Sequence, residues 1–221
     1  NKIYDEMIDF AKYAFNKSHA AAYAVVSYQT AWLKYYYPVE FMAALMTSVI
    51  DNPGKVSEYI YSCRQMGIKI LPPDINKGEG SFSVDGGNIR YGLAAIKSIG
   101  KPVIESIIQE RKNGGEFSNL KDFIERLSGK EVNKRTIESF IKSGAFDSLG
   151  GTRKQFMVVY VQILDQVNRE RKYSMTGQLS LFDIVSDDQK SEFDIPLPDV
   201  GEYEKETKLA FEKEVLGVYL S

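Results

Sequence analysis

A polar and basic cluster near the N-terminus has the composition of a phosphate-binding site. Lys17, Ser18 and His19 stand at the predicted start of a helix, with Asn16 before them and Tyr23 one turn after His19. The first turn of a helix carries unpaired N–H groups and a partial positive charge, so a lysine and a hydroxyl placed there suit a phosphate. Tyr23 shares a helix face with His19 and can stack on a base. An ordinary capped helix with a surface lysine and a core tyrosine would give the same pattern.

Two later segments have the pattern of paired short helices joined by a tight hairpin. Leu93–Ile104 resembles a helix-hairpin-helix motif, in which hairpin N–H groups and the second helix's N-terminus grip a DNA phosphate without reading sequence. Ser98 stands where the usual hairpin has its first glycine, and many αα-hairpins look alike. A second unit is predicted from residue 137 to the helix opened by Thr152. The predicted DNA-binding residues are Lys97, Ser98, Gly100, Lys101, Lys142, Gly144, Arg153 and Lys154.

An apolar pentapeptide interrupts a polar, acidic stretch after residue 173. Exposed apolar residues in a linker suggest docking into the pocket of a partner. The alternative is that they fold back on their own domain. The peptide resembles the bacterial sliding-clamp binding motif, which predicts clamp-binding residues Gln178, Leu179, Ser180, Leu181 and Phe182.

The composition excludes several other classes of protein. The 221 residues are 43% hydrophobic and 26% charged, which is typical of a globular chain rather than a disordered or fibrous one. One Cys and one His make neither a disulfide nor a zinc site, and the lone Cys63 favours a reducing compartment. We find no P-loop, no catalytic triad and no apolar run long enough for a bilayer. Asp187 and Asp188 lie in the linker without a scaffold for a metal.

Charge is unevenly distributed along the chain. Residues 93–172 hold 15 Lys and Arg against 10 Asp and Glu, a net charge of +5, whereas residues 173–221 hold 4 against 11, a net charge of −7. A basic segment of this kind favours a surface that faces a polyanion, although solvated helices reach such values by chance.

Apolar periodicity and turn residues predict a mainly α fold with one small β-hairpin. We expect helices over about 3–15, 19–36 (with Ser18 as N-cap), 39–50 and 55–66. The hairpin is expected around Asp85–Asn88, because Asp-Gly-Gly supplies the positive φ angles of such turns. Further helices are predicted over about 93–97, 101–112, 119–127, 134–143, 152–172 and 202–215.

In sequence order these pieces resemble family C, the bacterial replicative DNA polymerases, over nearly the whole chain. The matching stretches are Phe10–Ala24, Ser27–Thr30, Tyr37–Leu45, Met66–Ile68, Ile70–Asn76, Tyr91–Lys97, Ser143–Asp147 and Glu212–Ser221. The order of fingers, helix-hairpin-helix pair and clamp motif resembles one of the two main types within that family. We also interpret the chain as a piece of a longer polypeptide, since it lacks an initiator Met.

The resemblance implies a helical fingers segment over 1–92 and a tandem helix-hairpin-helix DNA-binding region over 93–172. A linker with the clamp motif follows over 173–200, and 201–221 begins the region toward an OB domain. The fingers would bind the incoming dNTP through Asn16, Lys17, Ser18, His19 and Tyr23.

The resemblance also implies where the chemistry occurs. The catalytic aspartates and their Mg²⁺ are expected in a palm N-terminal to this chain, which itself would hold no catalytic residue, metal or cofactor and would not polymerise alone. Expected partners are primer-template DNA, dNTP, the β sliding clamp and the other replicase subunits, in the bacterial cytoplasm and without a membrane. The alternative is a free-standing helix-hairpin-helix DNA-binding or clamp-interaction module.

Overall fold

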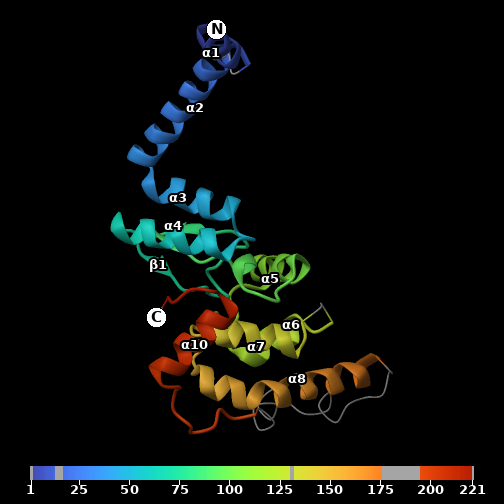
Figure 1. Ribbon diagram of the computed structural model, residues 1–221. Helices are drawn as coiled ribbons and strands as arrows, with labels where there is room; N and C mark the ends of the chain where they lie inside the picture. Colours follow the sequence, from blue (N-terminus) through green and yellow to red (C-terminus); the bar gives the residue numbers. More distant parts are fainter. Residues whose placement is uncertain (1, 13–16, 130–131, 176–194, 221) are drawn as a thin grey trace.

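The computed structural model describes residues 2–12, 17–129, 132–175 and 195–220. It consists of a helical body from which an N-terminal arm projects (Figure 1). The arm comprises α1 (Lys2–Lys12) and α2 (Lys17–Tyr36). The body begins with α3 (Pro38–Ser48), which packs on α4 (Pro53–Gln65). The fold is mainly α, as the sequence predicts.

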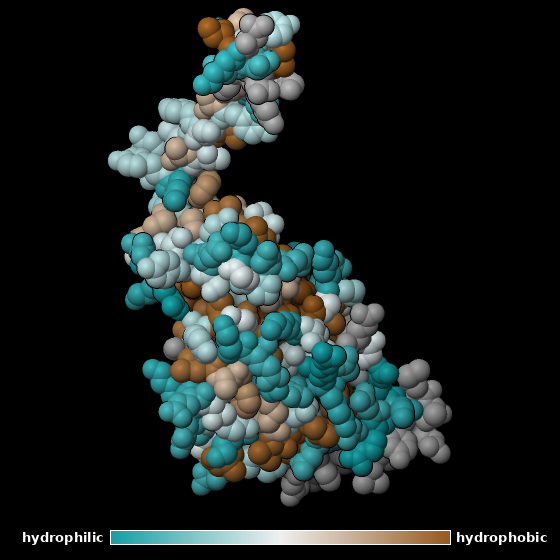
Figure 2. All heavy atoms as spheres, in the orientation of Figure 1, coloured by the Kyte–Doolittle hydropathy of each residue, from teal (hydrophilic) through white to brown (hydrophobic). Residues whose placement is uncertain are grey.

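Helix α2 is fully formed but has no buried residue. Alanines at 20, 21, 22 and 24 give its first half high helix propensity, which favours this helix in the absence of a buried face. Its side chains are instead displayed to solvent, and Figure 2 shows brown apolar residues on the arm beside hydrophilic ones. The exposed large apolar and aromatic residues of the arm and of the following Tyr37 are Ile3, Tyr4, Met7, Ile8, Tyr23, Val25, Val26, Tyr28, Trp32, Leu33, Tyr35, Tyr36 and Tyr37.

A three-stranded sheet follows α4, in the order β1-β3-β2. The antiparallel strands β2 (Ser83–Asp85) and β3 (Asn88–Arg90) form the predicted hairpin, and Gly86 and Gly87 take φ values of 57° and 78° at its turn. Strand β1 (Ile70–Leu71) pairs parallel to β3 and was not predicted as a strand. Its partner lies 19 residues away, which a local pattern of two apolar residues does not reveal.

The second half of the body is a layer of helices. A 3₁₀ turn, η1 (Leu93–Ala95), precedes α5 (Lys101–Gly114), α6 (Leu120–Arg126) and α7 (Lys134–Ser143). The long α8 (Arg153–Met175) lies against α6 and α7, and α10 (Lys205–Val215) packs on α7. A chain of mostly edge-to-face aromatic contacts joins these helices, at residues Phe117, Phe123, Phe140, Phe146 and Phe156.

Two boundaries differ from the predictions for reasons visible in the structure. Ser18 is the second residue of α2 and not its N-cap, since the helix begins at Lys17. The predicted helix over 93–97 is only the 3₁₀ turn η1, because the backbone becomes extended at Ile96 (ψ 125°). The buried residues form one continuous cluster from Met42 to Val218, so the predicted boundary at 92/93 falls within a shared core.

Within the described residues, no helix has both the length and the apolarity needed to cross a membrane. The same residues contain no group of three or more His, Cys, Asp or Glu side chains arranged to hold a metal ion.

Candidate nucleic-acid interface

The hairpin between η1 and α5 is the exposed connection of the first predicted unit. Ser98 has φ 70°, the one non-glycine residue with positive φ in the described chain. For the N–H groups of Ser98, Gly100 and Lys101, the described part of the chain provides no acceptor. All three residues are exposed, and Lys101 opens α5 with its side chain in solvent. Unpaired N–H groups, a helix N-terminus and a cation at one point form a site for an anion such as a phosphate.

The same hairpin is anchored from behind by the C-terminal end of α10. The Lys97 N–H donates to the Val215 carbonyl at 2.9 Å, and Lys97 Nζ donates to the Glu214 carbonyl at 2.9 Å. The buried Tyr91 hydroxyl donates to the Leu216 carbonyl at 3.0 Å, and burial raises the pKa of Tyr91. The last carbonyls of a helix lack partners within it, so these contacts cap α10 and fix the hairpin at once. Lys97 therefore acts mainly as an anchor of the hairpin.

In the predicted second unit, Arg153 does not offer its charge to a ligand. Its side chain is 4% exposed and its Nη2 lies 2.8 Å from Asp147 Oδ2, while Nη1 lies 3.3 Å from Glu212 Oε1. Burial lowers the pKa of Arg153, but hydrogen bonds and the charges of Asp147 and Glu212 outweigh that effect and raise it. Arg153 is thus a buried cation that ties α8 to α10, and its predicted contact with DNA stays a prediction.

Lys142 and Gly144 are likewise engaged within the protein. Lys142 Nζ lies 2.8 Å from Glu138 and 2.9 Å from Glu214. Burial lowers the pKa of Lys142, and the two carboxylates more than offset this and raise it. Gly144 is buried at the C-terminus of α7 with φ 81°, and its N–H donates to the Ile141 carbonyl. A side chain at this position would collide with Arg153. Neither residue presents a free group to a phosphate.

The N-terminus of α8 is already occupied by a carboxylate. Glu202 accepts hydrogen bonds from the N–H groups of Arg153 and Lys154, each at 3.2 Å. Thr152 and Gln155 form a reciprocal capping box, with Thr152 N–H donating to Gln155 Oε1 at 2.9 Å and Gln155 N–H donating to Thr152 Oγ1 at 3.2 Å. With these contacts the first N–H groups of α8 are satisfied, so the two predicted units differ at the start of their second helix: α8 is capped by Glu202, whereas the first N–H of α5 has no acceptor within the described residues.

The predicted nucleotide-binding residues lie together at the start of the projecting arm. Lys17, Ser18 and His19 form the exposed first turn of α2, and the rings of His19 and Tyr23 have centroids 4.4 Å apart. Asn16 lies outside the described residues. This surface combines the positive end of a helix with an aromatic pair, and the body of the chain does not cover it.

The predicted clamp-binding residues Gln178, Leu179, Ser180, Leu181 and Phe182 lie outside the described residues. The structure therefore fixes only the two ends of the linker, at Met175 and Ile195.

Comparison with known proteins places this arrangement in a family. Residues 67–156 match the family model described as a helix-hairpin-helix motif. The DNA polymerase III subunit alpha of Mycobacterium tuberculosis is 43% identical over 99% of the chain, and that of Vibrio cholerae is 44% identical over 100%. The subunit of Thermus aquaticus is 41% identical over 100% of the chain. The chain belongs to the DNA polymerase III alpha-subunit family, as a segment of such a subunit. It spans about a fifth of the length of these relatives, 18–19% in each.

The helix-hairpin-helix match begins within the part of this alpha-subunit segment that the sequence assigned to the fingers. It extends from Gly67 through the sheet and both predicted units to Phe156. Sequence reasoning missed the residues that anchor the region from outside, namely Glu202, Glu212 and the carbonyls of 214–216. An acidic stretch after a basic one is their only sequence signal, and it does not specify which carboxylate meets which cation.

Proposed function

We propose that this chain is the DNA-holding and nucleotide-facing part of a bacterial replicative polymerase, and that the hairpin Lys97–Lys101 binds the DNA backbone. One observation carries the proposal: Ser98, Gly100 and Lys101 present unpaired N–H groups at the N-terminus of a helix inside a matched helix-hairpin-helix region. Backbone amides that meet phosphates position a duplex without reading its sequence.

Duplex binding by the chain tests this proposal. Fluorescence anisotropy with two unrelated 20-bp duplexes should give equal affinities that fall as salt rises, because phosphate contacts release counterions. A tenfold preference for one sequence, or no binding at about 50 mM salt, would count against the hairpin as a backbone clamp.

The same proposal includes nucleotide binding by the arm. Lys17, Ser18 and His19 would face the triphosphate of the incoming dNTP, and Tyr23 would lie next to its base. The exposed first turn of α2 supports this, since a cation and helix N-terminus offset the charge that develops on pyrophosphate. In the full-length polymerase, Lys17→Ala should raise KM for dNTP about tenfold and leave duplex affinity within twofold, whereas Lys34→Ala near the opposite end of α2 should change neither. An unchanged KM would refute the triphosphate role.

The resemblance to the polymerase family implies that the Mg²⁺ ligands are palm aspartates. We therefore place the metal-dependent step outside this chain, as the expected palm aspartates imply. The chain alone should not extend a radiolabelled primer, and extension by the chain would overturn this division of labour.

Residues 178–182 would tether the polymerase III holoenzyme to the β sliding clamp, together with its other subunits. A tether raises the effective concentration of the polymerase at DNA without any stronger DNA contact. Leu181→Ala with Phe182→Ala should abolish binding to purified clamp, while Ile184→Ala with Val185→Ala in the same linker should leave it within threefold. Retained binding of the first variant would place the contact elsewhere.

A further inference from the structure

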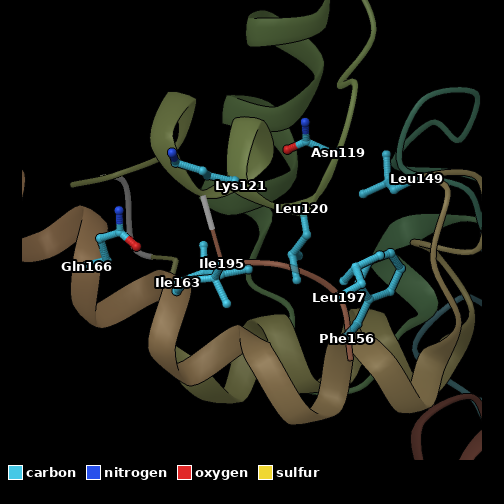
Figure 3. A pocket seen from close by; sticks show the side chains of 9 residues that line it. All are labelled: Asn119, Leu120, Lys121, Leu149, Phe156, Ile163, Gln166, Ile195 and Leu197. Atoms are coloured by element: carbon cyan, nitrogen blue, oxygen red, sulfur yellow. The ribbon is translucent and has the colours of Figure 1, made fainter. Parts of the chain in front are cut away.

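An apolar pocket opens between α6, α8 and the segment that follows the linker (Figure 3). Figure 3 shows the side chains of Leu120, Ile163, Ile195 and Leu197 directed toward a common space, with the polar Asn119, Lys121 and Gln166 around it. The cavity has a volume of about 170 Å³. An apolar cavity of roughly 150 Å³ accommodates a benzene ring, so the space suits one aromatic side chain and part of a neighbour.

The pocket lies at the place where the chain returns from the linker. The described chain leaves at Met175, the end of α8, and resumes at Ile195, which itself lines the pocket. Leu197, two residues later, lines it too and is 40% exposed, so the rim is accessible from solvent. After residues 176–194 the described chain therefore resumes in the lining of this cavity.

We propose that the pocket is the docking site for Leu181 and Phe182 of this chain's own linker. The chain between Met175 and Leu181 is long enough for Leu181 to reach the pocket. Nine residues of α8 separate Gln166 from Met175, about 14 Å of helix, and six extended residues from Met175 to Leu181 cover up to roughly 20 Å. The thirteen residues from Phe182 to Ile195 leave ample length for the return.

Charge and composition favour the same occupant. Residues 176–194 hold five acidic residues against Lys190 alone. The last turns of α8, where the described chain leaves for residues 176–194, carry the exposed cations Arg169, Arg171 and Lys172. Leu181 and Phe182 are adjacent members of an apolar group that also contains Leu179, Ile184 and Val185. Acidic residues can therefore follow the basic end of α8 while the apolar pair fills the cavity, which removes its apolar surface from water.

Docking also affects clamp binding, and this consequence rests on the proposed clamp function. The docked residues are those expected to enter the clamp, so docking in the chain and binding to the clamp exclude each other. The linker would hide its apolar pair until a clamp competes for it.

A peptide-competition experiment tests the docking without any clamp. The probe is a fluorescein-labelled peptide of residues 177–185, measured by anisotropy. It should bind the chain carrying Leu181→Ala and Phe182→Ala, whose own linker no longer fills the pocket. It should bind the unaltered chain at least tenfold more weakly. A peptide with both alanines should not bind either chain.

Pocket variants separate this site from any other surface. Leu197→Asp, added to the alanine variant, should lower peptide affinity at least tenfold. Val158→Asp, at a position on α8 that is 50% exposed and outside the pocket lining, should leave it within twofold. Circular dichroism spectra and melting temperatures of both variants, compared with those of the alanine variant, check that they fold.

Three results would overturn the proposal. These are equal peptide affinity for the unaltered and alanine chains, insensitivity to Leu197→Asp, or a concentration-dependent dimer in sedimentation that Leu197→Asp dissolves. Failure of the clamp proposal would not produce any of these results, because the peptide assay contains no clamp.

Discussion

Arg153 and Glu212 form an ion pair in the interior of the protein, with Nη1 3.3 Å from Oε1 and side chains only 4% and 1% exposed. The pair joins the first turn of α8 to α10, two elements 59 residues apart in sequence. Glu212 also accepts the Leu220 N–H at 2.8 Å, so it fixes the end of the described chain. A cation predicted to hold DNA thus holds the C-terminal helix in place.

Breaking this pair should destabilise the protein strongly. Arg153→Met leaves the Glu212 carboxylate buried without its cation and should cost about 3–5 kcal/mol of unfolding free energy. Arg153→Met combined with Glu212→Leu removes both charges and should be more stable than Arg153→Met alone. Urea denaturation measures the unfolding free energy of the single and the double variant. A double variant less stable than the single one would show that the ion pair is not what makes the single substitution costly.

The left-handed backbone at Ser98 predicts an unusual response to substitution. A non-glycine residue at φ 70° carries a cost of about 1–2 kcal/mol. Ser98→Gly removes that cost but gains unfolded-state entropy, so it should be neutral or stabilise by up to about 1 kcal/mol. Ser98→Val should destabilise, because β-branched residues avoid this region. Thermal denaturation compares the two variants. A larger loss for glycine than for valine would contradict the backbone assignment.

Lys97 and Lys101 should respond differently to loss of charge. Lys101 has an exposed side chain at the open hairpin, so Lys101→Met should reduce the salt slope of duplex binding by about 0.9, one phosphate contact. Lys97→Met breaks the bond to the Glu214 carbonyl and should cost about 1 kcal/mol of stability, with the salt slope unchanged. Anisotropy titrations at several salt concentrations, paired with urea melts, separate the two effects. A reduced slope for Lys97→Met would assign it to DNA instead.

Cys63 should be inert toward thiol reagents. Its side chain is fully buried, and burial raises the pKa of the thiol from its ordinary 9.0 to about 11. We expect slow reaction with a disulfide reagent at pH 8 and rapid reaction after unfolding in urea. The unfolded thiol ionises near pH 9 while the folded thiol stays neutral, so its stability contribution is complete below pH 9 and is lost as pH rises through 11. Cys63→Ala should remove that part of the pH dependence. Fast labelling of the native chain would refute the burial.

The sequence predicted those helices and turns whose bounds depend on residues close to them in the chain. Helix α7 spans the predicted range 134–143, between Asn133, which accepts from the Thr136 N–H at 3.1 Å, and Gly144, which takes φ 81°. The Asp-Gly-Gly turn produced the β2–β3 hairpin for the same reason. The sequence also predicted the position of the hairpin at Ser98. The left-handed backbone of that serine is seen only in the structure.

Contacts between distant segments could not be predicted in this way. Glu202 caps α8 from 48 and 49 residues away, and its identity as the partner depends on the path of the chain after the linker. The parallel pairing of β1 with β3 depends similarly on a tertiary arrangement. These contacts decide which basic residues remain open to DNA. Without them, the helix-hairpin-helix pattern and its basic residues placed Arg153 and Lys142 among the predicted DNA contacts.

The most direct test of the DNA-holding hairpin is a charge placed at its open amides. Gly100 has φ −79° and room for a side chain, with Pro102 Cδ the nearest atom at 3.6 Å, so Gly100→Glu should fold normally. Gln109→Glu, on the exposed side of the same helix, supplies an equal change in net charge. In duplex anisotropy, Gly100→Glu should weaken binding at least tenfold and Gln109→Glu less than threefold. Equal effects of the two variants, or none from Gly100→Glu, would contradict the account.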